Sequence, residues 1–247
     1  MTSLGMGYMG SRARRIAMIA SSIGALCLVA FLAAADELTA RDLFDRFQAV
    51  YSQSKVISCS FEEETIMDGQ KRVAHGRIFF QKPNRLRQEY VDPNDPDILA
   101  QLVVLDGAFS WSYTPWLNQV TRQEMDPEGA DELLPGIGGD FEDVPTQFDL
   151  SVGLDEIAAA QNVYLLVMRP KAQPDDPSSG ETLEVWIRGS DWTPVQFSYT
   201  SSLDNVTTVI RLQKLDMHAE VEPGTFEFDP PAGTEVITMT RRYKSDE

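Results

Sequence analysis

The chain has 247 residues but only two cysteines and two histidines. We expect Cys27 to be lost with the N-terminal apolar segment, which leaves Cys59 alone. A single cysteine forms neither an internal disulfide bond nor a cysteine metal cluster, so stability must come from an apolar core. His75 and His218 stand far apart and in no metal-binding or catalytic motif. We therefore expect neither a metal ion nor a cofactor.

Basic residues are also scarce, since 21 lysines and arginines stand against 38 aspartates and glutamates, for a formal net charge of −17. Loss of the N-terminal segment removes Arg12, Arg14 and Arg15 but no acidic residue, so −17 becomes −20. A protein this acidic repels nucleic acid and anionic membrane surfaces. We therefore expect no nucleic-acid partner.

One apolar run is long, and it extends from Ile16 to Leu32. It follows the three arginines and ends in Ala33-Ala34-Ala35, which is the basic, apolar and small-residue order of a secretory signal peptide. We predict cleavage after Ala35, so that residues 1–35 are the signal peptide and residues 36–247 form one exported, periplasmic, monomeric domain. The alternative, an uncleaved membrane anchor, leaves the alanines unexplained.

The apolar periodicity of the mature chain changes from helical to extended. The spacing of Leu43, Phe44 and Phe47 predicts a helix over residues 39–53, with Thr39 and Asp42 as its capping pair. From Val56 to Arg122 the period is two, in short runs between Gly, Pro, Asn and Asp turns, which predicts an antiparallel meander. Further strands are predicted at residues 147–152, 163–169, 182–188, 195–199 and 206–215.

Residues 126–144 break this rhythm, because they are rich in glycine, proline and acidic residues. Their apolar residues Leu133, Leu134 and Ile137 predict one or two short helices that act as a lid. Each strand offers one apolar face, which must be covered. We therefore predict a mainly β fold with α. It is a single curved antiparallel sheet, an unclosed β-barrel, covered by the N-terminal helix and the lid around an apolar cavity.

Aromatic residues alternate with serines after the turn at Asp106-Gly107, which places Phe109, Trp111 and Tyr113 on one face of a strand. They form either core or the wall of the cavity. We expect the lid residues to pack against them in the closed protein. The predicted lipid-binding residues on the strands and turns are Ile78, Phe80, Leu86, Tyr90, Phe109, Trp111, Tyr113 and Trp116.

Three segments carry a family likeness, namely Gly76 to Tyr90, Asp106 to Val120 and Phe226 to Val236. Together they resemble the outer-membrane lipoprotein carrier protein (LolA) family. The resemblance implies a non-enzymatic periplasmic shuttle whose apolar concavity holds the acyl chains of lipoproteins. Its implied partners are acylated lipoproteins, an inner-membrane lipoprotein-releasing transporter and an outer-membrane lipoprotein acceptor.

The resemblance also assigns a role to Lys82, which stands at the basic position before a proline. In the family this position holds the lid shut, so Lys82 is a candidate latch. Strand twist that lets the lysine reach water is an equally good explanation. Two positions depart from the family pattern. Gln88 replaces a frequent Trp, and the run from Glu62 to Glu64 stands where the family tends to be neutral or polar.

Two other function classes remain open. The first is an envelope lipid-binding or stress-sensing domain on the same scaffold. The second is a secreted hydrolase, for which the sequence offers no recognisable nucleophile and base. Copurified lipid would distinguish a carrier from a hydrolase, and a defect in lipoprotein sorting would distinguish a carrier from a sensor.

Overall fold

The computed structural model describes residues 38–125, 141, 144–171 and 180–239. The predicted signal peptide lies outside these residues, as do Leu133, Leu134 and Ile137 of the predicted lid. From Leu38 onward the chain forms one compact unit. Within the described ranges no helix is both long and apolar enough to cross a membrane.

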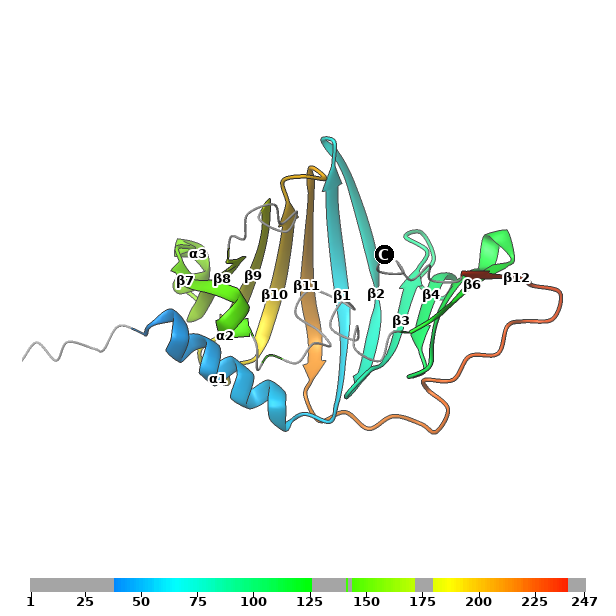
Figure 1. The fold of residues 1–247 in the computed structure, drawn as a ribbon, viewed down its shortest axis with the longest axis horizontal. Coiled ribbons are helices and arrows are strands. Elements are labelled where there is room, and N and C mark those ends of the chain that lie inside the picture. The colour runs from blue at the N-terminus through cyan, green and yellow to red at the C-terminus, as the bar shows by residue number, and fades with distance from the viewer. Residues whose placement is uncertain (1–37, 126–140, 142–143, 172–179, 240–247) are drawn as a thin grey trace, which may run out of the picture. The chain divides into compact units, whose positions relative to one another are not determined.

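A twelve-stranded sheet accounts for most of this unit (Figure 1). The strand order is β12-β6-β5-β4-β3-β2-β1-β11-β10-β9-β8-β7. All neighbours are antiparallel except β12, which runs parallel to β6. The strands are β1 Val56–Met67, β2 Gln70–Gln81, β3 Arg85–Val91, β4 Leu99–Leu105, β5 Phe109–Thr114, β6 Gln119–Glu124, β7 Phe148–Gly153, β8 Val163–Pro170, β9 Glu181–Arg188, β10 Pro194–Ser201, β11 Val206–Asp216 and β12 Glu235–Met239.

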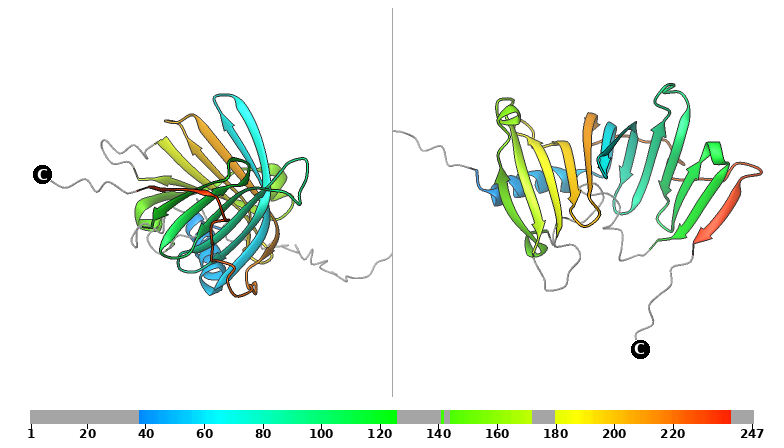
Figure 2. Two further views of the ribbon diagram at one scale, coloured as in Figure 1. Left: turned by 90° about the vertical axis from the view of Figure 1, so that its right-hand side faces the viewer. Right: turned by 90° about the horizontal axis from the view of Figure 1, so that it is seen from above.

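The end strands β7 and β12 do not pair with each other, and Figure 2 shows that they stay apart while the sheet curves between them. The sheet is therefore unclosed, and the predicted fold class is confirmed. The strand predictions are confirmed to within one or two residues at each end. Strand β12 lies in a segment for which the sequence predicted no strand.

The predicted N-terminal helix is α1, Ala40–Gln53, and its predicted cap is present. Thr39 and Asp42 form a capping box, in which the Asp42 backbone N–H donates to the Thr39 side chain at 3.1 Å. The buried face of α1 carries Phe44 and Phe47, and each contributes about 1.5–3 kcal/mol of hydrophobic stabilisation. The remaining helices are short: η1 Pro115–Leu117, α2 Val144–Gln147 and α3 Glu156–Ala159.

The two faces of the sheet are covered by different parts of the chain. We call the face toward α1 the inner face, because its side chains share one buried cluster with the helix. The opposite, outer face is contacted between β2 and β5 by residues 220–228 of the segment that joins β11 to β12, and this segment contributes buried Phe226. Arg87 of β3 donates to the Thr225 carbonyl at 3.4 Å and so connects this segment to the sheet.

Strand β8 departs from the expectation that every strand has one apolar and one wet face. Its residues Leu165 to Met168 are all buried. The pairing with β9 places Leu166 and Met168 on the inner face and Leu165 and Val167 on the outer face. Strand β8 therefore offers an apolar side chain to both faces of the sheet rather than to one.

Candidate functional site

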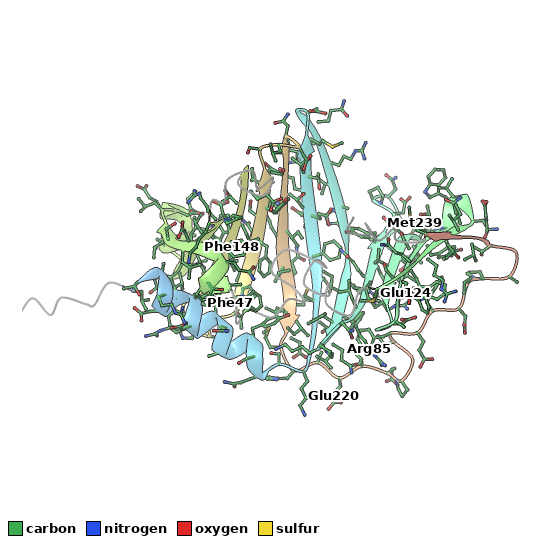
Figure 3. The ribbon with its side chains drawn as sticks, in the orientation of Figure 1. Phe47, Arg85, Glu124, Phe148, Glu220 and Met239 are labelled. Atoms are coloured by element: carbon green, nitrogen blue, oxygen red, sulfur yellow. The ribbon has the colours of Figure 1, made fainter. Side chains whose placement is uncertain are left out.

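The inner face is apolar across its central strands. Large buried side chains of eight strands form one cluster with the helix: Ile57, Cys59 and Phe61 of β1, Ile78 and Phe80 of β2, Leu86 of β3, Leu105 of β4, Leu166 and Met168 of β8, Val185 and Ile187 of β9, Phe197 of β10, and Ile210 of β11. Phe47 of α1 belongs to this cluster and Phe148 of β7 packs against it, and both lie toward the β7 end of the sheet (Figure 3).

Phe141 is the described residue of the predicted lid segment that reaches deepest into this cluster. Its ring centroid lies 5.2 Å from that of Phe47 and 4.7 Å from that of Tyr51, both in edge-to-face geometry. Aromatic pairs of this kind add about 0.5–1.5 kcal/mol beyond burial. The side-chain contacts of Phe141 with α1 are thus apolar, and acyl chains could replace them.

Four of the predicted lipid-binding residues lie on this inner face. Ile78, Phe80 and Leu86 are no more than 2% exposed and belong to the buried cluster. Tyr90 is half-buried and packs against it. Their placement agrees with the sequence expectation, and their role in lipid binding stays a prediction.

The other four predicted lipid-binding residues, Phe109, Trp111, Tyr113 and Trp116, do not lie on the inner face. Leu105 of the inner face pairs with Ser110, so Phe109, Trp111 and Tyr113 point to the outer face. There Phe228 packs against Trp111 and Tyr113, with ring centroids 5.9 and 5.8 Å away. Cross-strand partners share a face, so the register through the β4–β5 turn decided this placement.

The outer-face aromatics are held by charged neighbours. Asp106 accepts from Trp111 Nε1 at 2.7 Å, and the Arg122 guanidinium lies 3.6 Å from the Phe109 ring centroid. Burial opposes ionisation of Asp106, but the hydrogen bonds from Trp111 and the turn backbone keep its pKa below the usual value. Trp116 is 79% exposed on η1 and lines neither face. These contacts indicate a structural cluster.

Lys82 reaches the end of helix α1. Its Nζ donates to the Tyr51 carbonyl at 2.6 Å and lies 4.2 Å from the centroid of the Tyr51 ring. A cation at the C-terminal turn of a helix is favourable because it complements the helix dipole. The predicted latch residue therefore connects the sheet to α1, and its action on the lid stays a prediction.

A polar chain interrupts the apolar inner face between β3 and β1. Gln88 is 4% exposed and donates to the Tyr90 hydroxyl at 2.7 Å, and that hydroxyl donates to Glu63 at 2.9 Å. Burial and the Glu63 charge raise the pKa of Tyr90. Sequence reasoning noted Gln88 and the glutamate run as departures from the family pattern, but it did not bring them together.

The Tyr90 ring packs against Phe61 of β1 beside its cross-strand partner Gly76 of β2. Phe61 lies edge-on to it with centroids 5.3 Å apart. The Phe61 ring also covers Gly76, where an added Cβ would stand 2.7 Å from Phe61 Cζ. Glycine at this position therefore leaves room for the Phe61 ring.

Two further titratable side chains of the inner face, Cys59 and Tyr199, have raised pKa values. Burial raises the pKa of the Cys59 thiol to about 12, which makes it a core residue without thiolate reactivity. Burial and the neighbouring Glu181 raise the pKa of Tyr199 to about 12. In the described part of the chain, no cluster of three His, Cys, Asp or Glu side chains could hold a metal ion.

The outer face carries a groove of about 470 Å³ between β2, β3 and the segment from Glu220 to Thr225. Arg77 and Arg87 line it, and each contacts Glu89 at 2.7 Å. The charges of this groove are thus largely compensated within the protein. It is a polar surface feature and a poor environment for acyl chains.

Comparison with known proteins matches residues 52–229 to the family model described as "Outer membrane lipoprotein carrier protein LolA". An outer-membrane lipoprotein carrier protein of Chromobacterium violaceum is 27% identical over 193 residues, which cover 78% of this chain and 86% of the relative. One of Alkalilimnicola ehrlichii is 30% identical over 166 residues, 66% of this chain and 67% of the relative. The crystal structure of a LolA superfamily protein from Nitrosomonas europaea covers 78% of this chain and 99% of its own, with 10% identity and a TM-score of 0.41.

Proposed function

The chain belongs to the outer membrane lipoprotein carrier protein LolA family, and on this premise we propose that it carries lipoproteins through the periplasm with their acyl chains against the inner face. Family membership points to a binding or carrier protein rather than an enzyme. The proposed donor is an inner-membrane lipoprotein-releasing transporter, and the proposed acceptor lies in the outer membrane.

One observation carries this proposal, namely the apolar inner face whose cover is a helix and an aromatic side chain. The ring of Phe141 packs against Phe47 and Tyr51 of α1, and all three belong to one buried cluster with the apolar side chains of the inner face. Acyl chains offer contacts of the same kind, so exchange of one for the other changes the free energy little. A carrier needs this balance because it must release what it binds.

The first experiment is native mass spectrometry of the protein purified from the periplasm, followed by denaturing extraction of bound molecules. We expect an acylated lipoprotein or its lipopeptide among the extracted molecules. Free phospholipid would favour a general lipid-binding role instead. A protein that is empty, and that takes up no lipoprotein from membranes, would contradict the proposal.

A matched pair of variants on β11 tests which face binds lipid. Leu212 pairs with Phe61 and packs on the inner cluster, whereas Val209 pairs with Glu64 and Ser198 on the outer face. Leu212→Glu places a charge among the proposed acyl contacts and should reduce binding of a dipalmitoyl lipopeptide at least tenfold. Val209→Glu should leave binding within about twofold of the original. Equal effects of the two variants would contradict an inner-face site.

A further inference from the structure

The run of three glutamates on β1 is divided between the two faces of the sheet. Glu62 and Glu64 point to the outer face, where Arg211 Nη1 lies 2.9 and 3.4 Å from their carboxylates. Glu63 points to the inner face, opposite Ile210 of the buried cluster. None of the ion pairs of the described residues includes Glu63.

The hydrogen bonds at Glu63 leave acceptor capacity on its carboxylate. The Tyr90 hydroxyl donates to Oε2 at 2.9 Å, while Oε1 receives only a long contact of 3.5 Å from Thr65. Gln88 in turn donates to Tyr90 at 2.7 Å, so the hydroxyl proton is directed at Glu63. The carboxylate is held in one position, and a ligand could reach it because it is half-buried.

A fixed anion beside apolar side chains favours one kind of ligand group. A half-buried carboxylate opposite Ile210 has apolar side chains on part of its surroundings, and a cationic N–H donor would compensate its charge there. An amide or ester at the same place would bring no charge. The site therefore discriminates by the difference in binding free energy between a ligand with an ammonium group and the same ligand with an amide or ester.

We infer that Glu63, positioned by Tyr90 and Gln88, binds the primary ammonium group of a ligand whose acyl chains lie on the inner face. This inference rests on the proposed function, because it needs acyl chains beside the sheet. Two sources supply that chemistry. One is the free α-amino group of a diacylated lipoprotein, and the other is the head group of an ethanolamine phospholipid.

The test compares two lipopeptides that differ only at the amine. The first is a peptide with an S-dipalmitoylglyceryl cysteine and a free N-terminus, and the second is the same peptide with an acetylated N-terminus. We expect the protein to bind the free amine about tenfold more tightly. Glu63→Gln keeps an oxygen that accepts from Tyr90 but removes the charge, and it should reduce this preference to within about twofold.

Glu62→Gln is the matched control, because it removes the same charge from the neighbouring residue on the outer face. It should retain the preference for the free amine. Thermal melting of both variants shows whether they remain folded. To distinguish the lipoprotein amine from the ethanolamine head group, the transfer of fluorescent phosphatidylethanolamine from neutral vesicles is compared with that of phosphatidylcholine. A Glu63-dependent preference for ethanolamine points to the phospholipid, and its absence points to the lipoprotein amine.

Two results would overturn the inference in different ways. If the original protein and Glu63→Gln bind both lipopeptides equally, the ammonium site is absent while the carrier function stands. If neither lipopeptide binds to any of the proteins, the proposed function fails, and the inference fails with it.

Discussion

At the scale of single residues, charged side chains on the outer face connect the sheet to the segment between β11 and β12. Glu89 lies between Arg77 and Arg87, at 2.7 Å from each guanidinium, and Arg87 also donates to the Thr225 carbonyl. Partial burial alone would raise the pKa of Glu89, but Arg87 and Arg77 outweigh it and keep the pKa below its ordinary value of 4.5. The carboxylate therefore orients the arginine that contacts the segment.

This arrangement predicts acid sensitivity. The pKa of Glu89 is lower in the folded than in the unfolded protein, so its stabilisation is present above pH 4.5 and is lost as the pH falls through the folded value. Glu89→Gln should lower the free energy of unfolding by about 1 kcal/mol at pH 7. Below about pH 5, the free energy of unfolding of this variant should fall less with decreasing pH than that of the original protein. Urea unfolding between pH 3 and 7 measures this.

The exposed Glu124 serves as the control for Glu89. Glu124→Gln should change neither the stability at pH 7 nor its dependence on pH by more than about 0.5 kcal/mol. Equal pH profiles for Glu89→Gln and the original protein would show that the two arginines do not stabilise the folded state through Glu89.

At the scale of elements, the attachment of helix α1 matters most, because α1 covers the proposed acyl site. Its buried side chains include Leu43, Phe44 and Phe47, and Lys82 contacts its last turn through the Tyr51 carbonyl. The apolar contacts can be exchanged for lipid, but a charge-assisted hydrogen bond to one carbonyl cannot. The contact of Lys82 with α1 therefore stabilises the covered state specifically.

Lys82→Leu removes that bond and should keep the fold. We expect the free energy of unfolding to fall by about 1–3 kcal/mol, with an unchanged far-ultraviolet circular dichroism spectrum. Because only the covered state loses a contact, lipopeptide should bind more tightly and leave more slowly. Stopped-flow release of a fluorescent lipopeptide measures this, and unchanged transfer would contradict the latch. Lys55→Leu, at an exposed position before β1, is the control.

At the scale of the whole described unit, the sheet has two faces with separate roles. The inner face packs against α1 and Phe141, whereas the outer aromatics Trp111 and Tyr113 pack against Phe228 from the segment between β11 and β12. That segment returns the chain to the opposite end of the sheet, where β12 pairs with β6. The outer cluster therefore stabilises the end of the sheet opposite α1.

Phe228→Ala tests this division of roles. Loss of a half-buried ring should lower the free energy of unfolding by about 1–3 kcal/mol. Lipopeptide affinity should stay unchanged, because Phe228 lies on the outer face. Calorimetry with and without lipopeptide measures both quantities. Lost binding with native stability would place the lipid site on the outer face and contradict the proposed function.

Several properties followed from the sequence because they depend on neighbours along the chain. Helical periodicity and the Thr39–Asp42 pair predicted α1, and alternation with turn residues predicted the strands. Because each predicted strand has an apolar face that must be covered, the sequence predicted a single unclosed sheet. Ile78, Phe80 and Leu86 were placed on the core face correctly, because each lies on β2 or β3 beside one short turn.

Tertiary structure decided what depends on register and on distant segments. Alternation puts Phe109, Trp111 and Tyr113 on one face of β5, but the pairing of Leu105 with Ser110 determines that this is the outer face. Their partner Phe228 is more than a hundred residues away in sequence. In the same way Glu63 and Gln88 meet through Tyr90 only because β1, β2 and β3 lie side by side. Sequence periodicity determines which residues share a strand face, and only the strand pairing determines what that face meets.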